Sequence, residues 1–221
     1  MVRPSENMAE YYGRRAPEYE QIYYRHNPQR RREVDDEADR LRGLVRGRRV
    51  LELACGTGYW TKVMSETAAA IVASDMSAEM IEMARAKEYG CPVEFVQADM
   101  YGHDFGTGRF DVVALGFWYS HHPRQSFDRL YEVLERPLMP GGTIWMVDNN
   151  PPAEGPSLES VGIDEHGNNY KKRYLDNGQE FTILKNYFER KDLEELLGRR
   201  FDVKLLLHNP YYWSAVLERK G

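Results

Sequence analysis

Residues 50–58 of this chain, Val-Leu-Glu-Leu-Ala-Cys-Gly-Thr-Gly, decide its fold. The stretch from Val50 to Ala54 predicts a short buried strand, and the glycines after it predict a tight turn into a helix that begins near Tyr59. Paired glycines let a ligand approach the backbone closely, and the first turn of a helix offers free N–H donors. The stretch therefore predicts a ligand-binding turn between a strand and a helix.

The same alternation of strand and helix continues downstream. Further strands are predicted at residues 71–75, 93–96, 110–116 and 143–147, with helices after the cap Ser77 and from about Pro123 to Glu135, and a turn at Pro140-Gly141-Gly142. Strands that alternate with helices favour a mostly parallel sheet with helices on both faces. The predicted fold class is therefore α/β and Rossmann-like.

Segments of a different character flank this core. They are two polar helices at residues 5–25 and 29–46, a loop at 149–169, a hairpin at 170–187, a helix near 189–199, and strands at about 201–208 and 211–218. We read the chain as one domain with four parts: an N-terminal helical lid (1–46), a cofactor-binding core (47–148), a hairpin insertion over the acceptor site (149–188), and a closing helix and strands (189–221).

The hairpin carries two cations whose placement depends on its register. Leu-Asp-Asn-Gly fits a three-residue loop with Gly178 in the left-handed region. In that register Arg173, Phe181, Ile183 and Lys185 share one face, because side chains alternate along a strand. A two-residue turn would separate Arg173 from Lys185.

Composition excludes several classes of protein. The 221 residues include 30 Lys and Arg against 35 Asp and Glu, and the net charge of −5 disfavours a nucleic-acid binder, whose affinity rests on neutralising phosphates. No apolar run approaches the roughly 20 residues that span a bilayer. Cys55 and Cys91 offer neither a disulfide framework nor metal-ligand spacing, so we expect no metal. The expected protein is cytoplasmic, a monomer or homodimer, and acts on a small molecule rather than on nucleic acid or a membrane.

Three acids lie at the carboxyl ends of the first three predicted strands. Glu52 lies in the strand before the glycine turn, where it would repel a pyrophosphate but suit the ammonium of an amino-acid ligand. Asp75 stands about 20 residues after the turn, where a carboxylate can accept from both ribose hydroxyls. Asp99 closes the next strand, where it can accept from an adenine amino group. Thr61 stands where a dinucleotide fingerprint would have its third glycine, so the pattern argues against NAD.

With these residues the chain resembles the class I S-adenosylmethionine-dependent methyltransferases, and within them the small bacterial phosphonate O-methyltransferases. The resemblance implies a seven-stranded sheet with the last strand inserted antiparallel, and S-adenosyl-L-methionine as cofactor. It also rests on Tyr11-Tyr12-x-x-Arg15-Ala16-x-x-Tyr19, which resembles an opening helix that folds over the cofactor. The cofactor-binding residues that it implies are Tyr12, Tyr19, Glu52, Ala54, Gly56, Gly58, Trp60, Thr61, Asp75, Met76, Asp99, Met100 and Phe117.

The same resemblance extends to the methyl acceptor, through Trp118-x-x-His121-x-Pro123 and the hairpin from Arg173 to Lys185. It implies that His121 lies beside the acceptor. If the acceptor is protonated, His121 would suit the role of general base, since the ordinary pKa of histidine lies near working pH; the alternative is that His121 caps the following helix or is merely exposed. It implies that Arg173 and Lys185 hold an anionic acceptor, with His26 in place of a tyrosine of the family. The expected reaction is O-methylation of a phosphonate- or carboxylate-like metabolite.

Other interpretations remain open. The chain could methylate nitrogen, sulfur or carbon of another small molecule, or it could be a non-catalytic module that binds a nucleoside. Arg30-Arg31-Arg32 lies among acids and is read as a solvated helix face rather than a phosphate-binding patch.

Overall fold

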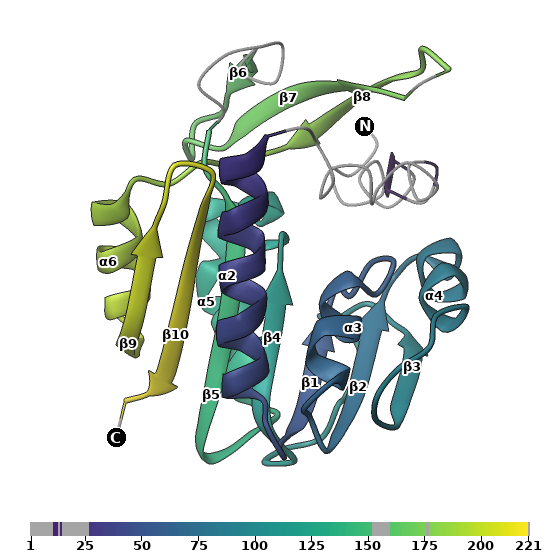
Figure 1. The fold of residues 1–221 in the computed structure, drawn as a ribbon. Helices are drawn as coiled ribbons and strands as arrows, with labels where there is room; N and C mark the ends of the chain where they lie inside the picture. Colours follow the sequence, from purple (N-terminus) through teal and green to yellow (C-terminus); the bar gives the residue numbers. More distant parts are fainter. Residues whose placement is uncertain (1–10, 13, 15–26, 152–159, 176, 221) are drawn as a thin grey trace.

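A computed structural model describes residues 11–12, 14, 27–151, 160–175 and 177–220. Its centre is a seven-stranded sheet in the order β3-β2-β1-β4-β5-β10-β9 (Figure 1). The strands along this order are Val93–Gln97, Ala70–Asp75, Arg49–Leu53, Phe110–Gly116, Leu138–Asn149, Tyr212–Arg219 and Phe201–His208. Strands β1 to β5 run parallel, and β10 lies antiparallel between β5 and β9. The Rossmann-like fold, with a late strand inserted antiparallel, is confirmed.

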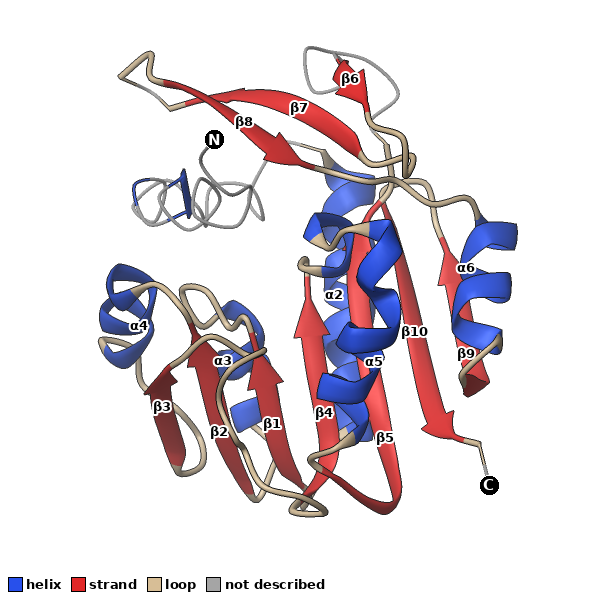
Figure 2. Cartoon of the chain, turned by 180° about the vertical axis from the view of Figure 1, so that it is seen from behind, coloured by secondary structure: helices blue, strands red, loops and turns tan. Residues whose placement is uncertain are grey.

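Helices cover both faces of this sheet (Figure 2). They are α2 (Pro28–Leu44), α3 (Tyr59–Ser65), α4 (Ala78–Arg85), α5 (Phe127–Glu135) and α6 (Arg190–Gly198), with short 3₁₀ turns η2 (Tyr119–His121) and η3 (Arg124–Ser126). The predicted helix from Pro123 is therefore wrong in its first turns, since the α-helix begins at Phe127 after η3. Ser77 caps α4 as predicted, and its hydroxyl accepts the N–H of Met80 at 3.2 Å.

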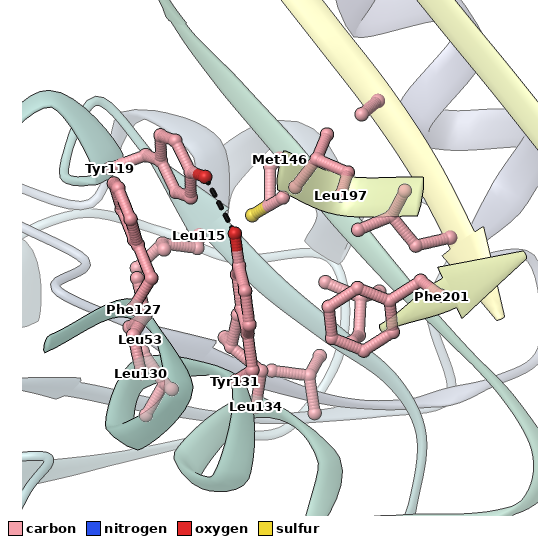
Figure 3. Packing of buried hydrophobic residues seen from close by; sticks show 14 of the residues in the cluster. Leu53, Leu115, Tyr119, Phe127, Leu130, Tyr131, Leu134, Met146, Leu197 and Phe201 are labelled. Atoms are coloured by element: carbon pink, nitrogen blue, oxygen red, sulfur yellow. Dashed lines mark hydrogen bonds between the residues drawn. The ribbon is translucent and has the colours of Figure 1, made fainter. Parts of the chain in front are cut away.

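The core forms because the central strands are apolar on both faces. Along β4, Val113 and Leu115 pack toward α5 and α6, while Val112 and Ala114 pack toward α2 and α3. Figure 3 shows the packing on the side of α5 and α6, where the hydroxyls of Tyr119 and Tyr131 are hydrogen-bonded inside the apolar cluster at 2.8 Å. Because apolar side chains of these strands alternate between the two faces of the sheet, each face packs against its own layer of helices.

A second sheet of three antiparallel strands lies across the carboxyl edge of the first (Figures 1 and 2). Its strands are β6 (Ser160–Ile163), β7 (Asn169–Tyr174) and β8 (Glu180–Leu184). Arg173 lies opposite Phe181, and the N–H of Leu175 donates to the carbonyl of Gln179 at 3.0 Å. Gly178 has φ 82°, so the predicted three-residue loop and its register are confirmed.

Two details of the predicted layout are wrong. The expected loop at 149–169 contains β6, which pairs with β7. Pro140-Gly141-Gly142 is not a turn ahead of the fifth strand, because β5 already begins at Leu138. The pairing shifts between Phe110–Leu138 and Val112–Thr143, so these residues form an irregularity inside the strand. Over the described residues, no helix is long and apolar enough to cross a membrane.

Candidate active site

Two positions of the turn after β1 favour glycine. Gly56 and Gly58 have φ angles of 56° and 83°, which favour glycine. A Cβ at Gly58 would lie 2.6 Å from the hydroxyl of Tyr89 and 3.1 Å from the Cβ of Ala84. The turn therefore leaves no room for a side chain on the side that faces α4.

Glu52 lies beneath this turn with 2% of its surface exposed. Burial raises the pKa of its carboxyl to about 8; the charge of Asp75 adds to the rise, and the hydroxyl of Thr61, which donates to Oε2, opposes it. The ionised form of a buried carboxyl with a raised pKa is stabilised strongly by a cationic partner. An ammonium group beside Glu52 would favour its ionised form and reverse the shift.

Asp75 holds the turn together from the end of β2. Its Oδ2 accepts the N–H of Gly56 and its Oδ1 accepts the N–H of Ser77, both at 2.9 Å. Burial raises the pKa of this carboxyl, and the backbone donors oppose the rise. Each carboxylate oxygen has a second lone pair, so Asp75 can accept ligand hydroxyls while it keeps both backbone bonds.

The next pair of strands adds an apolar side chain and a second acid. Met76, directly after β2, is 41% exposed, an unusual exposure for a large apolar side chain. Asp99 follows β3, which pairs with β2; it is exposed and accepts the N–H of Tyr101 at 2.9 Å. Met100, beside it, is buried. An exposed methionine next to an exposed carboxylate suits a flat heterocycle with an amino group.

Backbone strain marks this edge of the sheet as well. Among the described residues, Ala54 and Phe117 are the non-glycine residues with positive φ, at 53° and 57°. Such a conformation costs about 1–2 kcal/mol, and residues that keep it cluster at functional sites. The ring of Phe117 lies between Trp60 and Tyr212, at centroid distances of 6.1 and 5.7 Å. Both strained residues are among those predicted to contact the cofactor.

His121 lies at the end of η2, under the second sheet, and is 5% exposed. Its Nδ1 contacts the carbonyl of Leu184 at 2.7 Å, so Nδ1 carries the proton and donates it. The hydroxyl of Tyr12 therefore donates to Nε2, also at 2.7 Å. Burial, followed by the charge of Lys185, lowers the pKa of His121 to about 3. The predicted role of His121 as a base assumed the ordinary pKa of histidine, and the pKa of His121 in the structure is well below that value.

Lys185 is part of a buried charge cluster that the sequence did not reveal. Its Nζ lies 3.1 Å from Oδ1 of Asp148 and donates to Oγ of Ser120 at 2.6 Å. Asp148 is fully buried in β5 and also accepts the N–H of Ser120 at 2.8 Å. Burial is the largest influence on the pKa of Asp148 and acts to raise it, but the charge of Lys185 and the other lowering contributions, including the backbone donors of Ser120 and Asn149, together hold that pKa below its usual range. The one available signal was an acid directly after the apolar run Trp145-Met146-Val147.

Arg173 lies on the face of the hairpin that carries Phe181 and Lys185. Its Nη1 donates to the carbonyl of Lys172 at 2.9 Å, and its charge acts to lower the pKa of Tyr187, which burial raises. The charge of Arg173 contributes to the low pKa of His121. The structure thus brings His121, Lys185 and Arg173 together. Tyr19 and His26 lie outside the described residues.

The side chains at this edge of the sheet fit S-adenosyl-L-methionine. Glu52 offers a buried carboxyl to the ammonium, Asp75 offers acceptors to the ribose, and Met76 with Asp99 suits the adenine. A Cβ at Gly116 would lie 2.6 Å from the ring of Trp60, so the space beside Gly116, which precedes Phe117, is already filled by that aromatic side chain. Every one of these residues lies at the carboxyl edge, where ligands of open parallel sheets bind.

Comparison with known proteins agrees with this geometry. Residues 50–142 match a family model described as a methyltransferase domain. The chain is 30% identical to DhpI, a dehydrophos phosphonate methyltransferase solved with SAH, over 97% of this chain and 96% of that one, with a TM-score of 0.76. A DhpI–SAM–HEP complex is 28% identical over 99% of both chains, with a TM-score of 0.78.

Curated relatives match over a shorter stretch. Demethylmenaquinone methyltransferase of Lactococcus lactis subsp. lactis is 32% identical over 116 residues, which are 50% of this chain and 45% of that protein. The chain spans about half the length of the curated relatives it matches. The full-length match to DhpI, the family model and the fitted cofactor edge lead to one conclusion: this chain belongs to the S-adenosylmethionine-dependent methyltransferase family.

Proposed function

We propose that this protein transfers the methyl group of S-adenosyl-L-methionine to an oxygen atom of a small anionic metabolite with a phosphonate- or carboxylate-like group. The observation that carries the proposal is the meeting of Arg173 and Lys185 beside His121, under the hairpin that contributes both cations. Similarity to DhpI, which has been solved as a SAM–HEP complex, supports the same class of acceptor. The free thiols of Cys55 and Cys91 support a reducing, cytoplasmic setting, and we propose that the protein works there as a monomer or homodimer.

The cofactor supplies an electrophilic methyl group on a sulfonium, and the chain supplies orientation. The guanidinium of Arg173 can grip two oxygens of an anion at once, whereas the ammonium of Lys185 acts as a point charge. Held in line with the methyl group, the acceptor oxygen reacts with an effective concentration that lowers the barrier by about 7–11 kcal/mol. An ionised acceptor oxygen attacks directly, so this reaction needs no base.

The contacts of His121 support a positioning role in place of the expected role as a base. Its Nε2 accepts from Tyr12, and its low pKa keeps the ring neutral across the physiological range. A neutral ring with its lone pair engaged draws no proton from an acceptor. We infer that His121 positions Tyr12 beside the acceptor, so that Tyr12 and the hairpin insertion together border the site.

The test is a methyl-transfer assay with labelled S-adenosyl-L-methionine and a panel of phosphonates, carboxylates and phenols. We expect an O-methyl product from an anionic acceptor, and we expect Arg173→Gln to reduce kcat/KM by about 10- to 100-fold, as for the loss of a charge-assisted pair. Lys172→Gln is the matched control, because Lys172 is on the opposite face of β7 and pairs with Glu180 at 2.7 Å. Methylation of nitrogen, sulfur or carbon, or binding of SAH without any transfer, would overturn the proposal.

A further inference from the structure

The turn that carries Asp99 is linked to the start of α5 through two side chains, Tyr101 and His122. The hydroxyl of Tyr101 lies 2.6 Å from Nδ1 of His122, and Nε2 of His122 lies 2.8 Å from the carbonyl oxygen of Ser126. A carbonyl can only accept, so Nε2 carries the proton, Nδ1 accepts, and the Tyr101 hydroxyl donates. We call these two hydrogen bonds the Tyr101–His122 anchor.

The anchor lies mostly out of contact with solvent. His122 is 4% exposed and Tyr101 is half-buried, and their rings stack with centroids 5.6 Å apart. The guanidinium carbon of Arg129, in the first turn of α5, lies 5.1 Å from the centre of the Tyr101 ring. Burial raises the pKa of Tyr101 to about 12 and lowers the pKa of His122. Both side chains are therefore neutral near pH 7 and keep their roles as donor and acceptor.

The backbone connects this anchor to Asp99, two residues before Tyr101. The N–H of Tyr101 donates to Oδ1 of Asp99 at 2.9 Å, and the N–H groups of Gly102 and His103 donate to the Asp99 carbonyl at 3.1 and 3.0 Å. Tyr101 thus holds the carboxylate of Asp99 with its backbone and forms the anchor with its side chain. A carboxylate has about four acceptor positions, so Asp99 can accept a ligand amino group while it keeps this bond.

The turn around Asp99 lies on the surface of the molecule. Asp99, Gly102 and His103 are exposed, whereas Met100 is buried and attaches the turn to the core. The core thus fixes the path of the backbone, but the direction of the Asp99 carboxylate depends on the hydrogen bond from Tyr101. A binding group that is oriented before the ligand arrives loses less freedom on binding, so the affinity is higher.

We propose that Tyr101 and His122 are positioning residues that orient Asp99 toward the amino group of adenine, and that they give the cofactor site its selectivity for adenine over a base without this group. The inference rests on the placement of adenine at Asp99 that the proposed function assumes, and it is independent of the identity of the methyl acceptor. In this assignment neither residue contacts the cofactor, and both act through Asp99.

A cofactor analogue without the amino group distinguishes this role from a merely structural one. In S-inosyl-L-homocysteine a carbonyl oxygen stands where SAH has the adenine amino group, so the analogue has no donor for Asp99 at that position. A hydrogen bond from an amino group to a carboxylate tightens binding by about 10- to 100-fold. Loss of the anchor should remove that advantage from SAH and leave the binding of the analogue unchanged. A general loosening of the fold would weaken both ligands by the same factor.

Calorimetric titration of the full chain with each ligand measures the two affinities. We expect Tyr101→Phe to weaken SAH binding about tenfold and to change the Kd of S-inosyl-L-homocysteine by less than about twofold. His122→Leu removes the acceptor of the same hydrogen bond and should have the same effect. Because both substitutions break one bond, the double variant should bind SAH no more weakly than either single variant, whereas independent effects would multiply to about a hundredfold.

Tyr131→Phe is the matched control. It also removes a tyrosine hydroxyl from a hydrogen bond near α5, but that bond joins Tyr131 to Tyr119 at 2.8 Å and is separate from the anchor. We expect this variant to keep the wild-type preference for SAH. Binding of S-inosyl-L-homocysteine reports folding for each variant, and if His122→Leu binds neither ligand, Tyr101→Phe decides the question by the ratio of the two affinities.

Equal weakening of the two ligands, unchanged SAH binding by Tyr101→Phe, or multiplied losses in the double variant would each overturn the inference. Asp99→Ala separates it from the adenine assignment. If Asp99→Ala loses the preference for SAH while Tyr101→Phe keeps it, the anchor is refuted and the adenine assignment stands. If Asp99→Ala keeps the preference, both are refuted. These readouts measure binding alone, so the proposed methyl transfer is tested separately from them.

Discussion

We predict that the buried carboxyl of Glu52 makes the affinity for the cofactor depend on pH. Its pKa is raised to about 8, first by burial, so near neutral pH the carboxyl holds its proton when no cation adjoins it. An amino-acid ammonium at this position favours the carboxylate, so binding must release that proton. Affinity therefore rises with pH until the carboxyl is ionised before the ligand arrives.

The size of the effect follows from the pKa itself. At two pH units below that pKa, binding includes a deprotonation that costs about 2.7 kcal/mol, which is about a hundredfold in Kd. At one unit below, the loss is about tenfold. Glu52→Gln removes the titration, so its weaker affinity should not change over the same pH range. The oxygen of its amide can still accept the hydroxyl of Thr61.

Calorimetry of SAH binding between about pH 6 and pH 8 checks this expectation, because buffers of different ionisation enthalpy report the released proton directly. A Kd of the wild type that stays constant over this range, or binding without proton release, would refute the assignment of Glu52 to the ammonium. Stability gives a second measurement. Because the folded-state pKa is raised, the stability that Glu52 contributes is complete below its unfolded pKa and is lost as pH rises through about 8, so Glu52→Gln should be more stable than the wild type at about pH 9.

Three further substitutions test the packing beneath the site. Asp148→Asn should cost about 3–5 kcal/mol in urea unfolding, since it leaves the buried ammonium of Lys185 without its carboxylate; a cost below about 1 kcal/mol would show that the pair does not hold the two sheets together. Leu130→Ala opens a cavity in the fully buried face of α5 and should cost about 2–5 kcal/mol in the same assay, with an unchanged m-value. Gly116→Ala would place a methyl group 2.6 Å from the ring of Trp60, so we expect a lower Tm and weaker SAH binding, and wild-type values for both would contradict the close packing.

Much of the fold was predictable because its signals are local. The short strand that includes Val50–Leu53, the cap at Ser77 and the Leu175-to-Gly178 loop each depend on a few neighbouring residues, and each is confirmed. Strand β6 was not predictable, because all four of its residues are exposed and no apolar alternation marks it. Its position follows only from pairing with β7.

The site was predictable to a lesser extent. The acids after the first strands lie at one edge, since parallel strands end together. The burial of His121 and its contact with Tyr12 depend on segments 109 residues apart, so its shift in pKa has no signature in sequence. The same holds for Arg30, whose neighbours in sequence are solvated while its own contact with Tyr212 spans 182 residues.

The hairpin loop has a consequence for how this protein can evolve. Deletion or insertion of one residue between Leu175 and Gln179 would shift the pairing of β8 against β7 by one position. Lys185 would then exchange faces relative to Arg173 and Lys171, and the cations would no longer share one surface. Most surface loops accept changes in length. This one is expected to keep its length among descendants that retain the same acceptor, and a change in that length would mark lineages that have turned to a different one.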